Sequence, residues 1–396
     1  MITLAKTKNI PKLRFPGFSD EWEEKKIKDL FAFKQGIQAS VETQLFENIF
    51  GTVRFIRIID ITQSIESPRF IKDPGNIYHV RKEDLFMVRY GTPGLISIGY
   101  EGVIANNLFR LIPEHNKQID TKFYYYKFKQ LEKNILALSG SSSMPAISFS
   151  TLNNIKLPKP ILAEQQRVAE FLSSVDEWIS DLRGQKESLE KYKKGMMQKI
   201  FSQEIRFKDE NGKNFPEWEE KKLGDIGKFW NGKAHEQEIS ENGKYIVINS
   251  KFISQNGKVK KYSNSQNSPL KKDDVAIVMS DIPNGKAIGK CFLVDKDNFY
   301  TLNQRIGGIK SSEILSSFLI RILSRNKYFL KFDNGVSQTN LRKDDILRCP
   351  VVFPIIQEQQ KISEFLGSID NLIESKQQQI TQAEQWKKGL MQGLFV

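Results

Sequence analysis

A long internal repeat is the feature that most constrains this chain. Pro160–Phe201 recurs without gaps as Pro354–Phe395, an offset of 194 residues, and the copies are identical at 19 of 42 positions. The shared words include Glu-Gln-Gln, Glu-Phe-Leu and Lys-Lys-Gly-x-Met-Gln. A shorter repeat, Glu-Trp-Glu-Glu-Lys-Lys, stands at 21–26 and again at 217–222, each time after a Phe-Pro pair. Because a fixed period indicates a repeated architecture, the chain divides into block, helix, block, helix. The predicted boundaries are 1–158, 159–203, 204–350 and 351–396.

Both copies of the long repeat carry a heptad of apolar residues. The first copy has Ile161, Val168, Val175, Leu182, Leu189 and Met196, and the second has Ile355, Ile362, Ile369, Lys376, Ala383 and Leu390. An apolar period of 3.5 held over several heptads predicts a coiled-coil partner. At ~1.5 Å per residue, each helix is roughly 60 Å long. The alternative is that each helix packs only on its own block.

Additional apolar side chains flank the heptad and form a second seam. Leu172, Ile179, Leu366, Ile373 and Ile380 widen the stripe beyond what one partner helix would cover. We therefore expect the helices to pair with each other, with part of the apolar stripe left uncovered by that pairing. The residues predicted for helix pairing or a subunit interface are Val168, Phe171, Leu172, Val175, Trp178, Ile179, Leu182, Leu189, Ile362, Phe365, Leu366, Ile369, Leu372, Ile373 and Ile380.

The order of the segments predicts the topology. The first helix leaves block one and arrives at block two, so a second helix that packs against the first and runs the other way returns to block one. The predicted fold class is α+β: two globular mixed α/β domains separated by two long helices that form an antiparallel coiled coil, with pseudo-two-fold symmetry. Predicted strands include 54–61, 84–89, 275–279 and 300–306, and predicted helices include 121–138 and 314–332.

Charge indicates a polyanionic partner. The chain has 396 residues and a net charge of +13. Residues 1–158 carry +6 and residues 204–350 carry +7, whereas the two helical segments are nearly neutral. Two-fold protein symmetry matches the symmetry of DNA, and a pseudo-dimer with two different blocks would recognise two different half-sites at a fixed spacing. We interpret the blocks as contacting double-stranded DNA.

Several polar turns are candidates for base contacts. Arg89 ends a strand just before a Gly-Thr-Pro-Gly turn, and the corresponding run 277–286 of block two has no arginine at that place. Arginine matches a guanine edge, whereas Asn and Gln suit adenine. Many of these polar residues could equally be turn formers that satisfy the backbone. The predicted DNA-binding residues are Arg57, Arg89, Thr92, Asn106, Asn107, Ser141, Ser142, Ser143, Ser280, Asn284, Lys286, Asn303, Gln304, Arg305, Ser337, Gln338, Thr339 and Asn340.

Patterns for catalysis, metals and membranes are weak. The run Gly285-Lys-Ala-Ile-Gly-Lys-Cys291 has three residues between its glycines instead of the four of a phosphate-binding loop, and Cys at the magnesium-ligand position. Two cysteines and three dispersed histidines predict no metal site, and the carboxylates are interpreted as turn and cap residues. No segment has the length of a signal peptide's apolar core or a membrane span, so we expect an intracellular protein that contacts no membrane.

The whole chain resembles the specificity subunit of type I restriction-modification enzymes. The features that carry the resemblance are Phe-Pro and Trp-Glu opening each half, a variable basic block, and a Glu-Gln-Gln heptad helix ending in Lys-Lys-Gly-x-Met-Gln. The resemblance implies that each block is a target recognition domain for one half of a bipartite, asymmetric DNA site. It also implies that the helices fix the gap and dock two methyltransferase subunits, which restriction subunits join.

The resemblance further implies that this chain has no catalytic activity and binds no cofactor. S-adenosylmethionine, ATP and magnesium would be used by the partner subunits. Arg89 and the loops at 139–143 and 334–340 lie where such domains carry base-contacting loops. Two other classes stay open: a stand-alone nucleic-acid-binding scaffold without methyltransferase partners, and an enzyme whose motifs are unfamiliar. Co-purification of an added methyltransferase counts against the first, and activity of this chain alone would favour the second.

Overall fold

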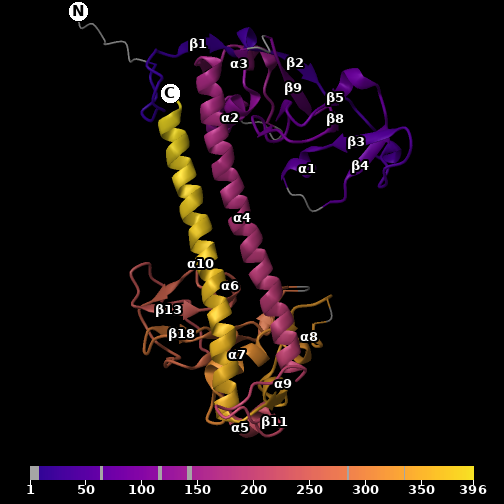
Figure 1. The fold of residues 1–396 in the computed structure, drawn as a ribbon. Coiled ribbons are helices and arrows are strands. Elements are labelled where there is room, and N and C mark those ends of the chain that lie inside the picture. The colour runs from indigo at the N-terminus through magenta and orange to yellow at the C-terminus, as the bar shows by residue number, and fades with distance from the viewer. Residues whose placement is uncertain (1–8, 63–65, 115–117, 141–144, 283–284, 334) are drawn as a thin grey trace, which may run out of the picture. The chain divides into compact units, whose positions relative to one another are not determined.

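The computed structural model describes residues 9–62, 66–114, 118–140, 145–282, 285–333 and 335–396 (Figure 1). The chain divides into two compact units. Unit 1 comprises Met1–Lys186 and Lys376–Val396, and unit 2 comprises Glu187–Ser375. Each unit therefore contains one block together with parts of both long helices, α4 (Leu162–Phe201) and α10 (Ile356–Leu394).

The short repeat closes each block on itself. In unit 1 the repeated Glu-Glu-Lys-Lys forms β1 (Glu23–Lys26), which pairs antiparallel with β10 (Lys156–Lys159), the last strand before α4. In unit 2 the same residues form β11 (Glu219–Lys222), which pairs with β21 (Pro350–Phe353) before α10. The opening of each block thus lies beside its end, at the start of a long helix.

Unit 1 contains two further sheets. The first has the order β2-β9-β6-β7 and is antiparallel throughout; the second has the order β4-β3-β8-β5, with β3 and β8 parallel. Their bounds are β2 Phe31–Gln35, β3 Thr52–Ile56, β4 Arg69–Lys72, β5 His79–Val80, β6 Leu85–Val88, β7 Ile96–Ser97, β8 Gly102–Ile104 and β9 Leu108–Pro113. The helices are α1 Ile58–Thr62, α2 Thr121–Ala137 and α3 Phe149–Asn153.

Unit 2 repeats this arrangement. Its sheets have the orders β12-β19-β15-β17 and β14-β13-β18, and β16 pairs with β20. The strands are β12 Gly227–Asn231, β13 Tyr245–Ile248, β14 Tyr262–Ser263, β15 Val275–Val278, β16 Ser280–Asp281, β17 Cys291–Leu293, β18 Tyr300–Leu302, β19 Ile306–Ser311 and β20 Thr339–Asn340. The helices are α5 Leu223–Ile226, α6 Ser250–Ser254, α7 Ser316–Leu323, α8 Lys327–Leu330 and α9 Lys343–Leu347.

The predicted strand at 54–61 is wrong in its second half. β3 ends at Ile56, and α1 begins at Ile58. The cause is Asp60, whose buried carboxylate accepts a hydrogen bond from the backbone N of Arg57 at 2.7 Å. Its side chain therefore caps the turn. The β-branched residues around Asp60 favour a strand in the sequence pattern, so this role was not predicted. The predicted strand at 300–306 is likewise two strands, β18 and β19, joined by a turn.

The two long helices run antiparallel within each unit, as predicted. In unit 1, Lys387 of α10 pairs with Asp176 of α4 at 2.5 Å, and Glu384 pairs with Arg183. Residue numbers rise along one helix while they fall along the other. In unit 2, Lys193 pairs with Asp370 at 2.5 Å, and these residues hold the same places in the repeat as Lys387 and Asp176. The internal repeat therefore places an equivalent Lys-Asp ion pair in each unit.

The repeated Glu-Gln-Gln fastens each long helix to its block. Glu164, buried to 2% exposure, accepts hydrogen bonds from Arg14 Nε at 2.8 Å, Arg14 Nη2 at 2.9 Å and Trp22 Nε1 at 3.0 Å. In unit 2, Glu358 accepts from Arg206 Nε at 3.3 Å, Arg206 Nη2 at 2.8 Å and Trp218 Nε1 at 3.3 Å. We call these two groups the Arg-Glu-Trp clamps. The carboxylate raises the pKa of Arg14 chiefly by hydrogen bonding, which keeps the guanidinium charged.

The glutamine after each clamp glutamate binds backbone groups beside the first residue of a helix of its block, α2 in unit 1 and α7 in unit 2. Gln165 Oε1 accepts from the backbone N of Asp120 at 2.9 Å, next to the start of α2, and its Nε2 donates to Pro160 O at 2.8 Å. Gln359 makes the matching bonds to Leu315 N, next to the start of α7, and to Pro354 O, each at 2.8 Å. These fully buried amides satisfy backbone groups that would otherwise lack partners.

Candidate nucleic-acid interface

Three segments of unit 1 meet at the end of β6. The backbone N of Arg89, just after β6, donates to Asn107 O in the turn between β8 and β9 at 2.9 Å. Arg89 O accepts from Ile147 N at 3.1 Å, and Gly91 N donates to Pro145 O at 2.9 Å. The strand end, the Asn106-Asn107 turn and the segment before α3 therefore form one surface, which combines candidates that lie far apart in the sequence.

Unit 2 has the same set of segments. Met279 N donates to Arg305 O at 3.0 Å, and Leu341 N donates to Met279 O at 2.7 Å. These bonds show that the turn at 303–305 corresponds to the turn at 106–107. The residue that replaces Arg89, left open by the sequence, is Met279, because Met279 has the matched backbone partners.

The candidate side chains of block one differ in availability. Thr92 and Asn106 are exposed, and Asn107 is half-buried with an Oδ1 atom that accepts no hydrogen bond from the described residues. Arg57 stands apart from this group, because Asp60 and Glu66 each hold its guanidinium at 3.0 Å. Its charge is therefore already paired within the block. Ser141, Ser142 and Ser143 lie outside the described residues.

Block two presents amides and one arginine. Gln304 and Arg305 are exposed in their turn beside the half-buried Asn303. Ser280, 6% exposed, bonds Gln338 Nε2 through its Oγ at 2.6 Å. Thr339 is buried and donates to Asp333 Oδ1 at 3.1 Å, so it supports the loop instead of facing outward. The remaining described candidates, all exposed, are Lys286, Ser337 and Asn340; Asn284 lies outside the described residues.

The predicted helix-interface residues fall into three groups. The first packs into the cores of the blocks: Val168, Phe171, Leu172, Ile362, Phe365, Leu366, Ile369 and Ile373. The second joins α4 to α10 in unit 1: Val175, Ile179, Leu182 and Ile380, with Ala383. The third is more open: Trp178 at 47% exposure, Leu372 at 53%, and the half-buried Leu189.

Most of the second seam is covered within the chain. Leu172 and Leu366 are 0% exposed, and Ile179 and Ile380 are buried between the helices. The first turns of each helix pack on their own block. Because α4 and α10 also pack on each other, the alternative that each helix packs only on its own block does not hold. The reason is geometric: at its start each helix is surrounded by its own block as well as by the other helix, so a wider apolar stripe is covered within the chain.

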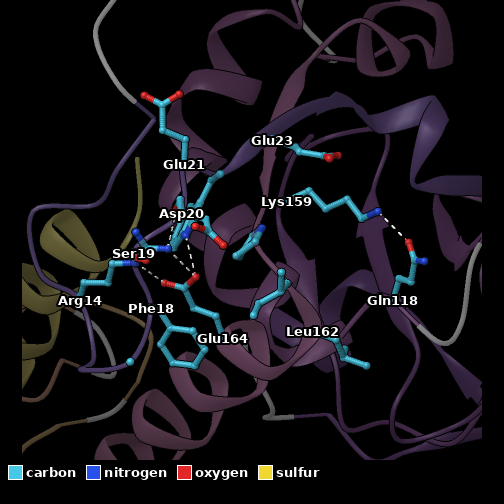
Figure 2. Close-up of a pocket in the computed structure, with 14 residues that line it drawn as sticks. Arg14, Phe18, Ser19, Asp20, Glu21, Glu23, Gln118, Lys159, Leu162 and Glu164 are labelled. Carbon is cyan, nitrogen blue, oxygen red and sulfur yellow. Dashed lines mark hydrogen bonds and ion pairs between the residues drawn. The ribbon is translucent and has the colours of Figure 1, made fainter.

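A cleft of about 510 Å³ opens beside the clamp of unit 1 (Figure 2). Its basic side chains are already engaged: Arg14 points to Glu164, and Lys159 Nζ donates to Gln118 Oε1 at 2.8 Å. The other charged side chains of the lining, Asp20, Glu21 and Glu23, are acidic, which does not favour an anionic ligand. The cleft is therefore a consequence of the clamp and offers no evident ligand chemistry.

The described residues offer neither a metal cluster nor a helix that could span a membrane. Within the described ranges, no group of three or more His, Cys, Asp or Glu side chains is placed to hold a metal ion. Among the helices of the same ranges, none combines the length and apolarity needed to cross a bilayer. Burial raises the pKa of both Cys291 and Cys349, to about 12 for Cys349, so neither is an activated thiolate.

Known proteins match the chain over nearly its full length. The family model of the type I restriction modification DNA specificity domain matches twice, at residues 19–191 and 216–385. The chain is 29% identical over 403 residues to the type I restriction enzyme MjaVIII specificity subunit of Methanocaldococcus jannaschii, covering 96% of this chain and 92% of that protein.

Solved structures share the fold. The S subunit of a type I system from M. genitalium aligns with a TM-score of 0.62 at 18% identity, covering 98% of this chain and 99% of the other. A chain from a structure on complex assembly and conformational transition of the type I R-M system aligns with a TM-score of 0.58 at 13% identity, covering 97% and 99%. With two copies of the specificity domain that together span most of its residues, the chain belongs to the family of type I restriction-modification specificity subunits.

Proposed function

We propose that this chain selects the DNA target of a type I restriction-modification complex. Each block recognises one half of a bipartite, asymmetric site in double-stranded DNA, and the paired helices fix the gap between the half-sites. The chain itself is the non-catalytic subunit and binds no cofactor. Adenine methylation from S-adenosylmethionine and ATP- and magnesium-dependent cleavage belong to two methyltransferase subunits and to restriction subunits. The site of action is the bacterial cytoplasm, where the DNA is.

One observation carries this proposal: the blocks share a backbone framework but differ in the side chains displayed on it. The bonds from Arg89 N to Asn107 O and from Met279 N to Arg305 O are equivalent, yet the strand-end residue is Arg in one block and Met in the other. The adjoining turn carries Asn-Asn in one block and Gln-Arg in the other. Two matched frameworks with different donors and acceptors suit two half-sites of different sequence.

The exposed aromatic residues of the helices support docking of two copies of one partner. In unit 1, Trp178 and Trp386 are 47% and 48% exposed and contact each other edge to face at 6.3 Å between ring centroids. The same repeat positions in unit 2 hold Leu372 and Tyr192, 53% and 51% exposed. Large, half-exposed apolar side chains are typical anchors of protein interfaces. Since each unit presents one such pair, two equivalent methyltransferase subunits can dock.

Co-expression of this chain with its methyltransferase partner tests whether each block recognises one half-site. Mapping modified adenines across a genome should give a split motif. When residues 204–350 are replaced by the corresponding block of another family member, one half-site should change while the other half-site and the gap stay the same. A change in both half-sites would refute independent recognition by the blocks.

Stoichiometry tests the docking part. Trp178→Ala combined with Trp386→Ala should lower the number of methyltransferase subunits bound per chain from two to one, as measured by native mass spectrometry. Leu372→Ala combined with Tyr192→Ala should remove the other subunit and serves as the matched variant. Retention of two subunits by both double variants would exclude these pairs as docking anchors.

A further inference from the structure

Gln35, the last residue of β2, is oriented by two backbone carbonyls. Its Nε2 donates to Asn106 O and to Leu108 O, the latter at 3.3 Å. Because both donor hydrogens are directed at these carbonyls, the amide oxygen faces the other way. That oxygen accepts from Arg89 Nη1 at 2.9 Å. The half-buried Gln35 side chain therefore links the Asn106 turn to the guanidinium at the end of β6.

Arg89 is held on two further sides. Its Nε donates to Ile147 O at 3.4 Å, and its guanidinium carbon lies 4.2 Å from the ring centroid of Phe149 and 5.0 Å from that of Tyr90. Stacking on an aromatic ring fixes the plane of a guanidinium. No described residue accepts a hydrogen bond from Nη2. Nη2 and the second hydrogen of Nη1 are thus left free to donate, while the position of the guanidinium is fixed from three directions.

Block two lacks the three side chains of this arrangement but keeps its backbone. Gly36 N donates to Leu108 O at 2.9 Å, and Gly232 N donates to Ile306 O at 2.9 Å, so Asn231 corresponds to Gln35. By the matched bonds described above, Met279 corresponds to Arg89 and Lys343 to Phe149. A contact required by the fold would be needed in both blocks. Its presence in one block alone, replaced at all three positions in the other, indicates a role in specificity.

We propose that Gln35 is a positioning residue that presets Arg89 to recognise a guanine in the half-site of block one. Phe149 supplies the stacking surface. Arginine donates two parallel hydrogen bonds to O6 and N7 of guanine, and a preset guanidinium loses less side-chain freedom on binding. Block two, with Met279 at the equivalent position, does not recognise guanine by this means. The inference rests on the proposed function, because it assumes that block one contacts base edges.

The test measures base preference, position by position, in the complex with its methyltransferase subunits. The wild-type complex first selects its site from a randomised duplex library. Arg89→Ala should then lower the preference for guanine at one position of half-site one by about 5- to 150-fold. Gln35→Ala should lower it at the same position by about 2- to 10-fold. Replacement of that guanine by 7-deazaguanine, which lacks N7, should weaken binding by the wild type but not by Arg89→Ala.

Half-site two is the internal control, and Asn231→Ala is the matched variant. Gln35→Ala should leave the base preferences of half-site two unchanged. Asn231→Ala should leave the guanine preference of half-site one unchanged. If Gln35→Ala disrupts all of half-site one, Gln35→Met, which keeps the side-chain length, decides the question. Guanine preference equal to wild type in Gln35→Met overturns the inference. A wild-type complex that selects no split site would instead refute the proposed function itself.

Discussion

Replacing Glu164 by alanine should destabilise unit 1 strongly. The substitution removes the acceptor of three hydrogen bonds, two from Arg14 and one from Trp22, at 2.8 to 3.0 Å. Arg14 is 13% exposed and would keep a largely buried, unpaired charge. Removing one partner of a buried ion pair costs about 3–5 kcal/mol, and an unpaired buried Trp donor adds about 1–3 kcal/mol. Because Arg14 also donates to Asp20 O, we expect the lower end of the summed cost, about 4 kcal/mol.

Hydrogen-exchange mass spectrometry is the suitable assay, because it reports the free energy of opening for each segment. Peptides of unit 1 should lose protection to a greater degree than peptides of unit 2. Glu170→Ala, at an exposed position of the same helix, is the control and should change protection by less than about 0.5 kcal/mol. Glu358→Ala should act on unit 2 with a somewhat smaller effect, because its bonds from Arg206 Nε and Trp218 Nε1 are longer, at 3.3 Å each.

A double substitution separates the ion pair from the packing. Arg14→Met combined with Glu164→Leu removes both charges and should recover part of the loss, since apolar replacements of a buried pair are often neutral. If Glu164→Ala stays within about 0.5 kcal/mol of the control, the clamp does not hold the helix to the block. In that case the repeated Glu-Gln-Gln would need another explanation.

Three further predictions concern the helices and the blocks. Lys387→Asp should destabilise the helix pairing of unit 1 by about 1 kcal/mol or more, and Asp176→Lys in the same chain should restore part of it; chemical denaturation of the single and double variants checks this. Burial lowers the pKa of Lys127 to about 8, below its value in the unfolded chain, so the unfolded chain binds more protons between those two pKa values. The free energy of unfolding should therefore rise as pH increases from about 8 to about 10. Lys127→Met should remove this pH dependence, as measured by thermal unfolding across that range. Gly36→Ala and Gly232→Ala should each unfold a block, because a Cβ would collide with the backbone oxygen of Ala105 in the first case and of Asn303 in the second. Gly195 lies in open space on α4, so Gly195→Ala should stabilise its helix by about 1 kcal/mol. Circular-dichroism melts measure both effects.

The sequence by itself determined the architecture of this protein. The repeat predicted two blocks and two long helices, and the heptads with the chain order predicted antiparallel pairing. Both follow from patterns that can be counted in the sequence, a period of 3.5 and an offset of 194 residues, without knowledge of any contact. The family resemblance rested on the same repeated words.

Tertiary structure decided what the repeated residues do. Glu164 contacts Arg14, 150 residues away, and no period relates those two positions. Leu172, predicted for helix pairing or a subunit interface, is buried because the block adjoins the start of its helix. Likewise, Met279 replaces Arg89 and Gln35 orients that arginine, since strand pairing and turn geometry bring four segments together. Local pattern sets which residues share a face; long-range packing sets which partner each of them meets.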